Sequence, residues 1–259
     1  MTSHHITADQ AAGPRGVIVT GGGTGIGRAT ARAFAEQGDR VLVVGRTPAA
    51  LDATAEGHDG IRVLAADIAE PDAPDRVVDT ALRAFGRIDV LINNAVAHGY
   101  RRLADTDREL LDEQWGTNLR APVLLTRSAL GALEAGGGTV VNVSSSGARG
   151  ERAWPENGLY GAAKAALDFL TRTWAVELAP RGIQVVGIAP GVTDTRSGPR
   201  LGMTEQAYDG FLTQLADRTP AGRVGTPDEI AWWICQLTRP EARHATGVVL
   251  PVDGGLSLT

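Results

Sequence analysis

The chain has 259 residues, and 43% of them are hydrophobic, which is enough material for one large α/β domain. Its net charge of −5 at pH 7 argues against nucleic acid as a partner, and no basic cluster indicates binding to a membrane surface. Cys235 is the only cysteine, so an internal disulfide and a metal site built on thiolates are excluded. We therefore expect a protein of the reducing cytoplasm, with no metal site.

The first 14 residues are polar and end in Gly13-Pro14, which predicts a flexible N-terminal arm over residues 1–14. Residues 15–259 then form one domain. No apolar run approaches the about 18 residues that a membrane span needs, and no basic region precedes a hydrophobic stretch at the N-terminus. We expect no membrane partner.

From Gly16 onward, short apolar runs alternate with helical patterns. The runs are apolar throughout, which is typical of parallel strands covered on both faces. The alternation predicts a doubly wound, Rossmann-type domain, with a seven-stranded parallel sheet and helices on both faces. The expected strands are 17–20, 40–44, 61–65, 90–92, 139–143, 184–188 and 247–251. The expected helices are 26–37, 49–55, 71–85, 107–115, 118–133, 159–179 and 227–237.

The turn after the first strand carries a glycine cluster, with Gly21, Gly25 and Gly27 in the run from Thr20 to Gly27. Glycines let backbone N–H groups approach a pyrophosphate, which then lies at the positive end of the following helix. The spacing differs from G-x-G-x-x-G, and a glycine cluster alone could be a flexible turn. Its place between the first strand and the first helix nevertheless favours a dinucleotide site.

The second strand ends in Gly45-Arg46-Thr47. An NAD-preferring site offers a carboxylate at this point to the ribose 2′-hydroxyl. Arg46 would instead pair with a 2′-phosphate, so the sequence predicts NADP(H), with NAD(H) as the less favoured cofactor. The alternative is that Arg46 only ends the strand in water.

Polar residues also follow the third and fourth strands. Asp67, in Ala66-Asp67-Ile68, could bind an adenine amino group or cap the next turn. Asn93-Asn94-Ala95 places amides at the carboxyl edge of the sheet, where open α/β sheets bind ligands. We expect these amides also to tie neighbouring strands together.

Tyr160 and Lys164 are four residues apart at the start of a predicted helix, so they share one face. Lys164 is the only lysine in the chain. An ammonium beside a phenol favours the phenolate, so we expect a lowered pKa for Tyr160 and a role as acid and base. The alternative for this spacing alone is an ordinary surface pair.

Together and in this order, these motifs resemble the short-chain dehydrogenase/reductase family. The resemblance rests on Thr20-Gly-x-x-x-Gly-x-Gly27, Asn93-Asn94-Ala95, Asn118, Ser145, Tyr160-x-x-x-Lys164 and Pro190-Gly191, and extends to Asp253-Gly254-Gly255. It implies that Tyr160 transfers the substrate proton while Lys164 lowers its pKa and holds the nicotinamide ribose. Ser145 would then bind the carbonyl oxygen, and Asn118 would anchor a water of a proton relay.

The resemblance also implies a set of residues in contact with the cofactor. They are Gly21, Gly23, Thr24, Gly25, Ile26, Gly27, Arg46, Thr47, Asp67, Ile68, Asn94, Ala95, Val143, Tyr160, Lys164, Pro190, Gly191, Val192 and Thr195.

The expected reaction interconverts a ketone and a secondary alcohol, with Val96, Ser145, Trp154 and Tyr160 at the substrate. Residues 196–223, with one helical patch over 205–215, resemble the family's mobile lid. A free hydrophobic or polycyclic ketone is the preferred substrate. A carrier-bound 3-oxoacyl group, or an alcohol or sugar oxidised with NAD, stays open, and so does a non-catalytic NADP-sensing protein. The family resemblance further implies a homotetramer or homodimer.

Overall fold

The computed structural model describes residues 13–149 and 154–259. The predicted arm over residues 1–14 therefore lies almost wholly outside the described residues. Seven parallel strands form one sheet in the order β3-β2-β1-β4-β5-β6-β7, which confirms the predicted parallel, doubly wound architecture. The strands are β1 (Gly16–Thr20), β2 (Arg40–Gly45), β3 (Ile61–Ala65), β4 (Val90–Asn93), β5 (Thr139–Val143), β6 (Gln184–Pro190) and β7 (Val249–Val252).

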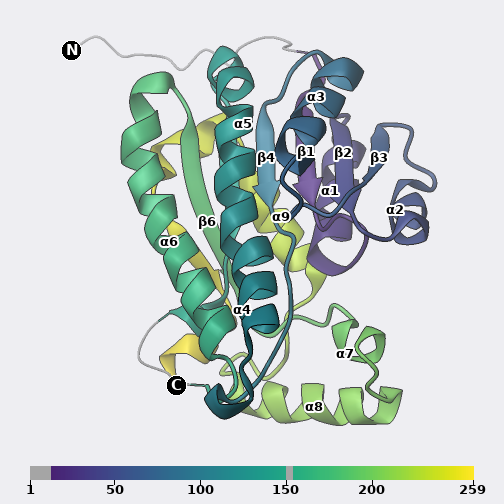
Figure 1. Cartoon of the computed structure of the whole chain (residues 1–259), viewed down its shortest axis with the longest axis vertical. Helices are drawn as coiled ribbons and strands as arrows, with labels where there is room; N and C mark the ends of the chain where they lie inside the picture. The colour runs from purple at the N-terminus through teal and green to yellow at the C-terminus, as the bar shows by residue number, and fades with distance from the viewer. Residues whose placement is uncertain (1–12, 150–153) are drawn as a thin grey trace.

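Helices cover both faces of this sheet (Figure 1). Side chains of β1 point alternately to the two faces: Ile18 joins a core beneath α3, α5 and α6, whereas Val17 and Val19 join a core beneath α1 and α9. The helices are α1 (Gly25–Glu36), α2 (Pro48–Ala55), α3 (Ala73–Phe85), α4 (Arg108–Trp115), α5 (Ala121–Gly136), α6 (Gly158–Leu178), α7 (Ser197–Arg200), α8 (Glu205–Arg218) and α9 (Pro227–Leu237).

Two local features differ from the sequence prediction. The regular helix expected from residue 118 begins instead with a π-helical turn over Gly116–Arg120, and α5 follows it. Two helices, α7 and α8, lie below the sheet in Figure 1, where only one helical patch over 205–215 was expected. A helix as short as α7 shows too little periodicity to be recognised from its sequence.

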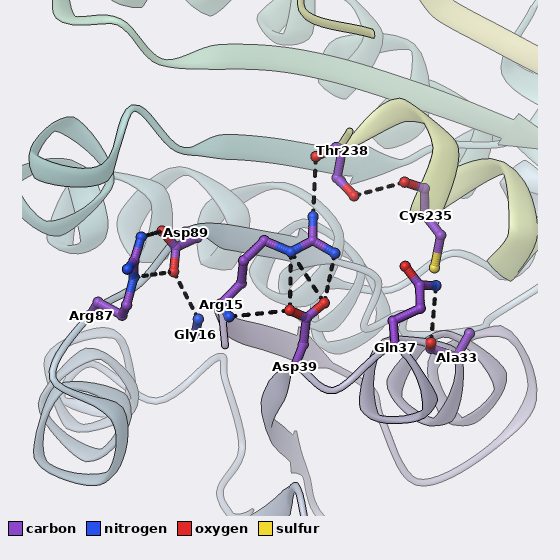
Figure 2. A network of polar contacts seen from close by, with 9 residues as sticks. All are labelled: Arg15, Gly16, Ala33, Gln37, Asp39, Arg87, Asp89, Cys235 and Thr238. Atoms are coloured by element: carbon purple, nitrogen blue, oxygen red, sulfur yellow. Dashed lines mark hydrogen bonds and ion pairs between the residues drawn. The ribbon is translucent and has the colours of Figure 1, made fainter. Parts of the chain in front are cut away.

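The amino end of the sheet is held by two ion pairs, drawn in Figure 2. Arg15 Nη2 lies 2.6 Å from Asp39 Oδ2, which joins the chain before β1 to the start of β2. The Asp89 carboxylate pairs with Arg87 and accepts a hydrogen bond of 2.8 Å from the Gly16 backbone N–H. Both carboxylates are buried, so their charges are matched within the protein.

Within the described residues, no helix is both long enough and apolar enough to cross a membrane.

Candidate active site

The glycine cluster forms the tight turn between β1 and α1. Gly21 has a φ of +65°, which favours glycine over any other residue. A Cβ atom at Gly27 would lie 2.2 Å from the Gly21 carbonyl oxygen, so a larger residue would force the turn open. A Cβ atom at Gly25 would lie 2.9 Å from the Thr195 Cβ. These contacts bring bare backbone and the positive end of α1 to the carboxyl edge of the sheet.

A cavity of about 180 Å³ lies beside this turn and gathers many residues of the predicted cofactor site. It is lined by Gly21, Gly23, Thr24, Gly45, Arg46, Thr47, Ala50, Leu51, Ala66, Asp67, Ile68, Ala95, Val96 and Thr117. Val96, which the sequence placed at the substrate, lines this cavity, and Thr117 was not expected there. The only lining carboxylate, Asp67, also accepts a hydrogen bond of 2.9 Å from the Ala69 N–H, so it caps the following turn.

The two asparagines after β4 bind their neighbours in the sheet. Asn93 Nδ2 donates to Asn142 Oδ1 at 2.9 Å, which links β4 to β5. Asn94 Nδ2 donates to the Thr20 carbonyl oxygen at 2.8 Å, which links the residue after β4 to β1. These amides therefore tie the strands together, as expected from the sequence, and fix the edge on which a cofactor would lie.

The start of α6 brings Tyr160 and Lys164 together beside the end of β5. Lys164 is 2% exposed, and its Nζ donates a hydrogen bond of 2.7 Å to the Val143 carbonyl oxygen. The same Nζ lies 5.9 Å from the centre of the Tyr160 ring. Ser145 is the second residue after β5, and its Oγ accepts a hydrogen bond of 3.1 Å from the Gly147 N–H.

The pKa of Tyr160 is raised, which is opposite to the direction that the sequence predicted. Burial of the phenol is the main cause, with Tyr100 adding to it, while the Ser145 hydroxyl acts in the opposite direction. Burial also lowers the pKa of Lys164 to about 8, although Asp168 favours its charged form. The expectation was wrong because helical spacing gives the approach of the ammonium but not the burial of both groups.

Asn118 lies in the π-helical turn, and both ends of its side-chain amide bind one residue of the loop after β4. Asn118 Oδ1 accepts from the Ala97 N–H at 3.0 Å, and Nδ2 donates to the Ala97 carbonyl oxygen at 3.1 Å. The amide is buried. Its observed contacts therefore position the loop after β4, whereas the water of the predicted relay remains a prediction.

The segment after β6 returns to the glycine turn. A Cβ atom at Gly191 would lie 2.6 Å from the Asp253 Cα, so the chain passes close to the residues after β7. Thr195 then lines a groove together with Thr24 and Gly25. The predicted positions at both ends of a bound cofactor are thus brought to one edge of the sheet.

Two aromatic residues beside Tyr160 were missed by the sequence analysis. The His98 ring centre lies 6.4 Å from that of Tyr160, and the Tyr100 ring centre lies 6.1 Å from it. Both residues follow the Asn-Asn-Ala motif, and this closeness in sequence was the one signal that could have identified them. Trp154, the remaining predicted substrate residue, is half-buried, and its carbonyl oxygen accepts from the Asn157 N–H at 3.2 Å.

In the described part of the chain, no group of three His, Cys, Asp or Glu side chains is arranged to hold a metal ion.

Known proteins and a protein-family profile match this chain over nearly its whole length. The profile of a family described as enoyl-(acyl carrier protein) reductase matches residues 21–257. The short-chain reductase protein NovJ of Streptomyces niveus is 37% identical over 92% of this chain and 92% of its own. The L-xylulose reductase of Bos taurus is 33% identical over 95% and 97%. A crystal structure of a short-chain dehydrogenase/reductase of unknown function from Caenorhabditis elegans, with cofactor, has a TM-score of 0.89 at 34% identity, covering 95% of this chain and 96% of the other.

Proposed function

Because this chain belongs to the short-chain dehydrogenase/reductase family, whose members use a nicotinamide cofactor, we propose that it is an NADP(H)-dependent ketoreductase. It interconverts a ketone and a secondary alcohol on a small organic substrate. The observation that carries the proposal is the close approach of Tyr160, Lys164 and Ser145 at the edge that also holds the glycine turn.

The residues at this edge fit a dinucleotide phosphate. The glycine turn packs so closely against Ala95, Thr195 and its own backbone that a Cβ atom does not fit, and α1 begins at Gly25 with backbone N–H groups at its positive end, where a phosphate binds. Arg46 lines the neighbouring cavity, is exposed and forms no ion pair within residues 13–149 and 154–259. Its guanidinium is free to bind a 2′-phosphate, which supports NADP(H) over NAD(H).

The bound cofactor supplies or accepts the hydride. The chain's own residues stabilise the negative charge that develops on the substrate oxygen. The Tyr160 hydroxyl donates the proton during reduction, which suits a phenol whose raised pKa keeps it protonated. The Ser145 hydroxyl donates a hydrogen bond to the same oxygen. Lys164 is the nearby cation, and Asn118 holds the loop that faces Tyr160.

A free hydrophobic ketone is the proposed substrate, and α7 and α8 of the proposed lid over residues 196–223 would cover it. Two exposed apolar side chains of this segment, Met203 and Phe211, support that choice. The matching family's description favours a carrier-bound substrate instead, and the L-xylulose reductase relative favours a sugar. A cofactor-sensing protein without turnover is disfavoured because Tyr160 and Lys164 are both present.

Steady-state kinetics tests the proposal directly. Oxidation of NADPH is followed by absorbance with a panel of ketones, with NADH in parallel and Tyr160→Phe as the inactive control. We expect ketone-dependent turnover, a higher kcat/KM with NADPH than with NADH, and loss of turnover in the variant. Equal values for the two cofactors would refute the NADP preference. Tight binding of NADPH without turnover of any ketone would favour the sensing protein.

We further propose that the chain assembles as a homotetramer or homodimer. Trp232 and Trp233 of α9 form an exposed edge-to-face pair, with ring centres 4.8 Å apart. Phe169 and Val176 of α6 are 61% and 78% exposed. Large apolar side chains exposed on two helices are typical of interfaces. Light scattering after size-exclusion chromatography measures the mass, and a monomer at micromolar concentration would contradict this assembly.

A further inference from the structure

The loop after β4 carries an imidazole that the proposed proton transfer does not use. His98 lies next to Tyr160 with a ring-centre distance of 6.4 Å and an angle of 21° between the ring planes. Tyr100 completes the group, with its ring centre 6.3 Å from that of His98. Three rings with polar atoms thus surround the point where the Tyr160 hydroxyl would meet a substrate.

The backbone is held in place at the residue before His98 and at the residue after it. Before it, the Ala97 backbone N–H and carbonyl are both bound by the Asn118 amide. After it, a Cβ atom at Gly99 would lie 2.4 Å from Leu110 Cδ1 of α4, so the backbone is packed tightly against that helix. A loop held in this way presents its side chain in one place, as a binding group requires.

Further along the same loop, two residues bind Glu156, which lies just before α6. The Arg101 N–H donates to the Glu156 carbonyl oxygen at 3.0 Å, and Arg102 Nε lies 3.2 Å from Glu156 Oε1. The loop after β4, which carries His98, is therefore joined to the segment that leads into α6, and Tyr160 lies in the first turn of that helix.

The surroundings of His98 favour the neutral form of its imidazole at physiological pH. Its pKa is lowered from the usual 6.5, first by burial, then by Lys164 of α6 and by Arg200 of α7. A neutral imidazole has one N–H donor and one lone-pair acceptor. The His98 side chain is still exposed, and its ring nitrogens make no hydrogen bond to any residue within 13–149 and 154–259. Both hydrogen-bonding atoms are thus available to a ligand.

We propose that His98 is a specificity-determining residue that selects ketones carrying a second oxygen, a hydroxyl or carbonyl, next to the reacting carbonyl. This rests on the proposed function, because Tyr160 marks the reacting oxygen. The neutral ring can donate to a carbonyl or accept from a hydroxyl, and Tyr160 is its immediate neighbour. A plain ketone would cover the imidazole without giving it a partner, and a polar group left unpaired in this way lowers affinity.

The test compares α-hydroxyacetophenone with acetophenone, two ketones that differ only in the second oxygen. kcat/KM with NADPH is measured for the natural chain and for His98→Phe, which keeps an aromatic ring without hydrogen-bonding atoms. We expect the natural chain to prefer the hydroxyketone by about tenfold, the value of one neutral hydrogen bond. In His98→Phe we expect the ratio to fall close to one.

Two further variants separate the loss of hydrogen bonding at His98 from a general effect of the substitution. His98→Asn keeps a donor and an acceptor in a smaller side chain, and we expect it to retain part of the preference even if His98→Phe folds poorly. His244 is an exposed histidine outside the site, so His244→Phe is the matched control and should keep the full ratio. An unchanged ratio in His98→Phe and His98→Asn would overturn the inference.

Calorimetric titration of both ketones into the chain with NADP⁺ distinguishes the two proposals. Tighter binding of the hydroxyketone that is lost in His98→Phe supports this inference, even if no ketone is turned over and the ketoreductase proposal fails. Equal affinity for the two ketones, together with turnover of both at equal efficiency, would overturn the role of His98 and leave the ketoreductase proposal standing.

Discussion

The two ends of the sheet differ in whether their charged side chains are paired with an opposite charge. At the amino end, Asp39 and Asp89 are buried against Arg15 and Arg87, and both carboxylates also accept backbone hydrogen bonds (Figure 2). At the carboxyl end, Arg46 has no carboxylate partner among the described residues. The difference indicates that the first end holds the fold together, whereas the second keeps polar groups for ligands.

Helix α6 also buries two charged residues, and these are not paired as the residues at the amino end are. Lys164 is buried with only a carbonyl oxygen as its hydrogen-bond partner, and Asp168, one turn further, buries an Oδ1 that has no partner among the described residues. Burial raises the pKa of Asp168 and lowers that of Lys164, so both shifts oppose charge. Such groups cost stability, and we expect that cost to appear at α6 and not at the amino end.

The largest expected effect is on catalysis. Tyr160→Phe removes the proton donor and should lower kcat by about 10³-fold or more, while the affinity for NADPH and the free energy of unfolding stay close to their original values. Turnover and a fluorescence titration with NADPH check both parts. Tyr100→Phe is the control, since it removes a neighbouring phenol; turnover in Tyr160→Phe comparable to that of the control would contradict the assigned role.

The second effect concerns stability at the amino end. Asp89→Asn removes a buried charge that pairs with Arg87, and should lower the free energy of unfolding by about 3 kcal/mol. Urea unfolding measures it. Asp72→Asn disrupts the exposed pair with Arg76 and should cost less than about 0.5 kcal/mol. Similar losses in the two variants would mean that burial of the pair does not matter.

The third effect separates the two cofactors. Arg46→Ala should lower kcat/KM with NADPH by about 30-fold, because a charge-assisted hydrogen bond to a 2′-phosphate is lost, and should change the value with NADH much less. Arg62→Ala, at an exposed arginine of β3, is the control. A parallel fall with both cofactors would place Arg46 elsewhere on the dinucleotide.

The smallest effect is a pH dependence of stability. Lys164 has a pKa of about 8 in the folded chain and 10.5 when unperturbed. Between these two pH values the unfolded chain binds more protons at Lys164 than the folded chain does. This group therefore raises the free energy of unfolding as pH rises. The raised pKa of Tyr160 acts in the opposite sense above about pH 10, where the unfolded phenol ionises first.

Comparison of the natural chain with Lys164→Met isolates this contribution. The natural chain should gain roughly 1 to 2 kcal/mol relative to the variant between about pH 7 and pH 9.5. Urea unfolding at the two pH values measures the gain. A difference that does not change with pH would show that Lys164 is not desolvated.

The sequence predicted the fold well because apolar runs and helical periods are local properties. The glycine spacing and the four-residue step from Tyr160 to Lys164 are local too, so much of the site could be placed. His98 was missed because only the packing of Gly99 on α4 and the Asn118 amide bring it to Tyr160. The direction of the Tyr160 pKa was missed because burial is set by the whole fold.

The burial of Lys164 has a practical consequence for labelling. It is the only side-chain amine of the protein, so an amine-directed reagent can react only with Lys164 and the α-amino group. With 2% of its surface exposed, Lys164 should react only when the start of α6 opens. Mild coupling through amines should therefore attach the protein at its α-amino group, and slow labelling of Lys164 should report how often the start of α6 opens.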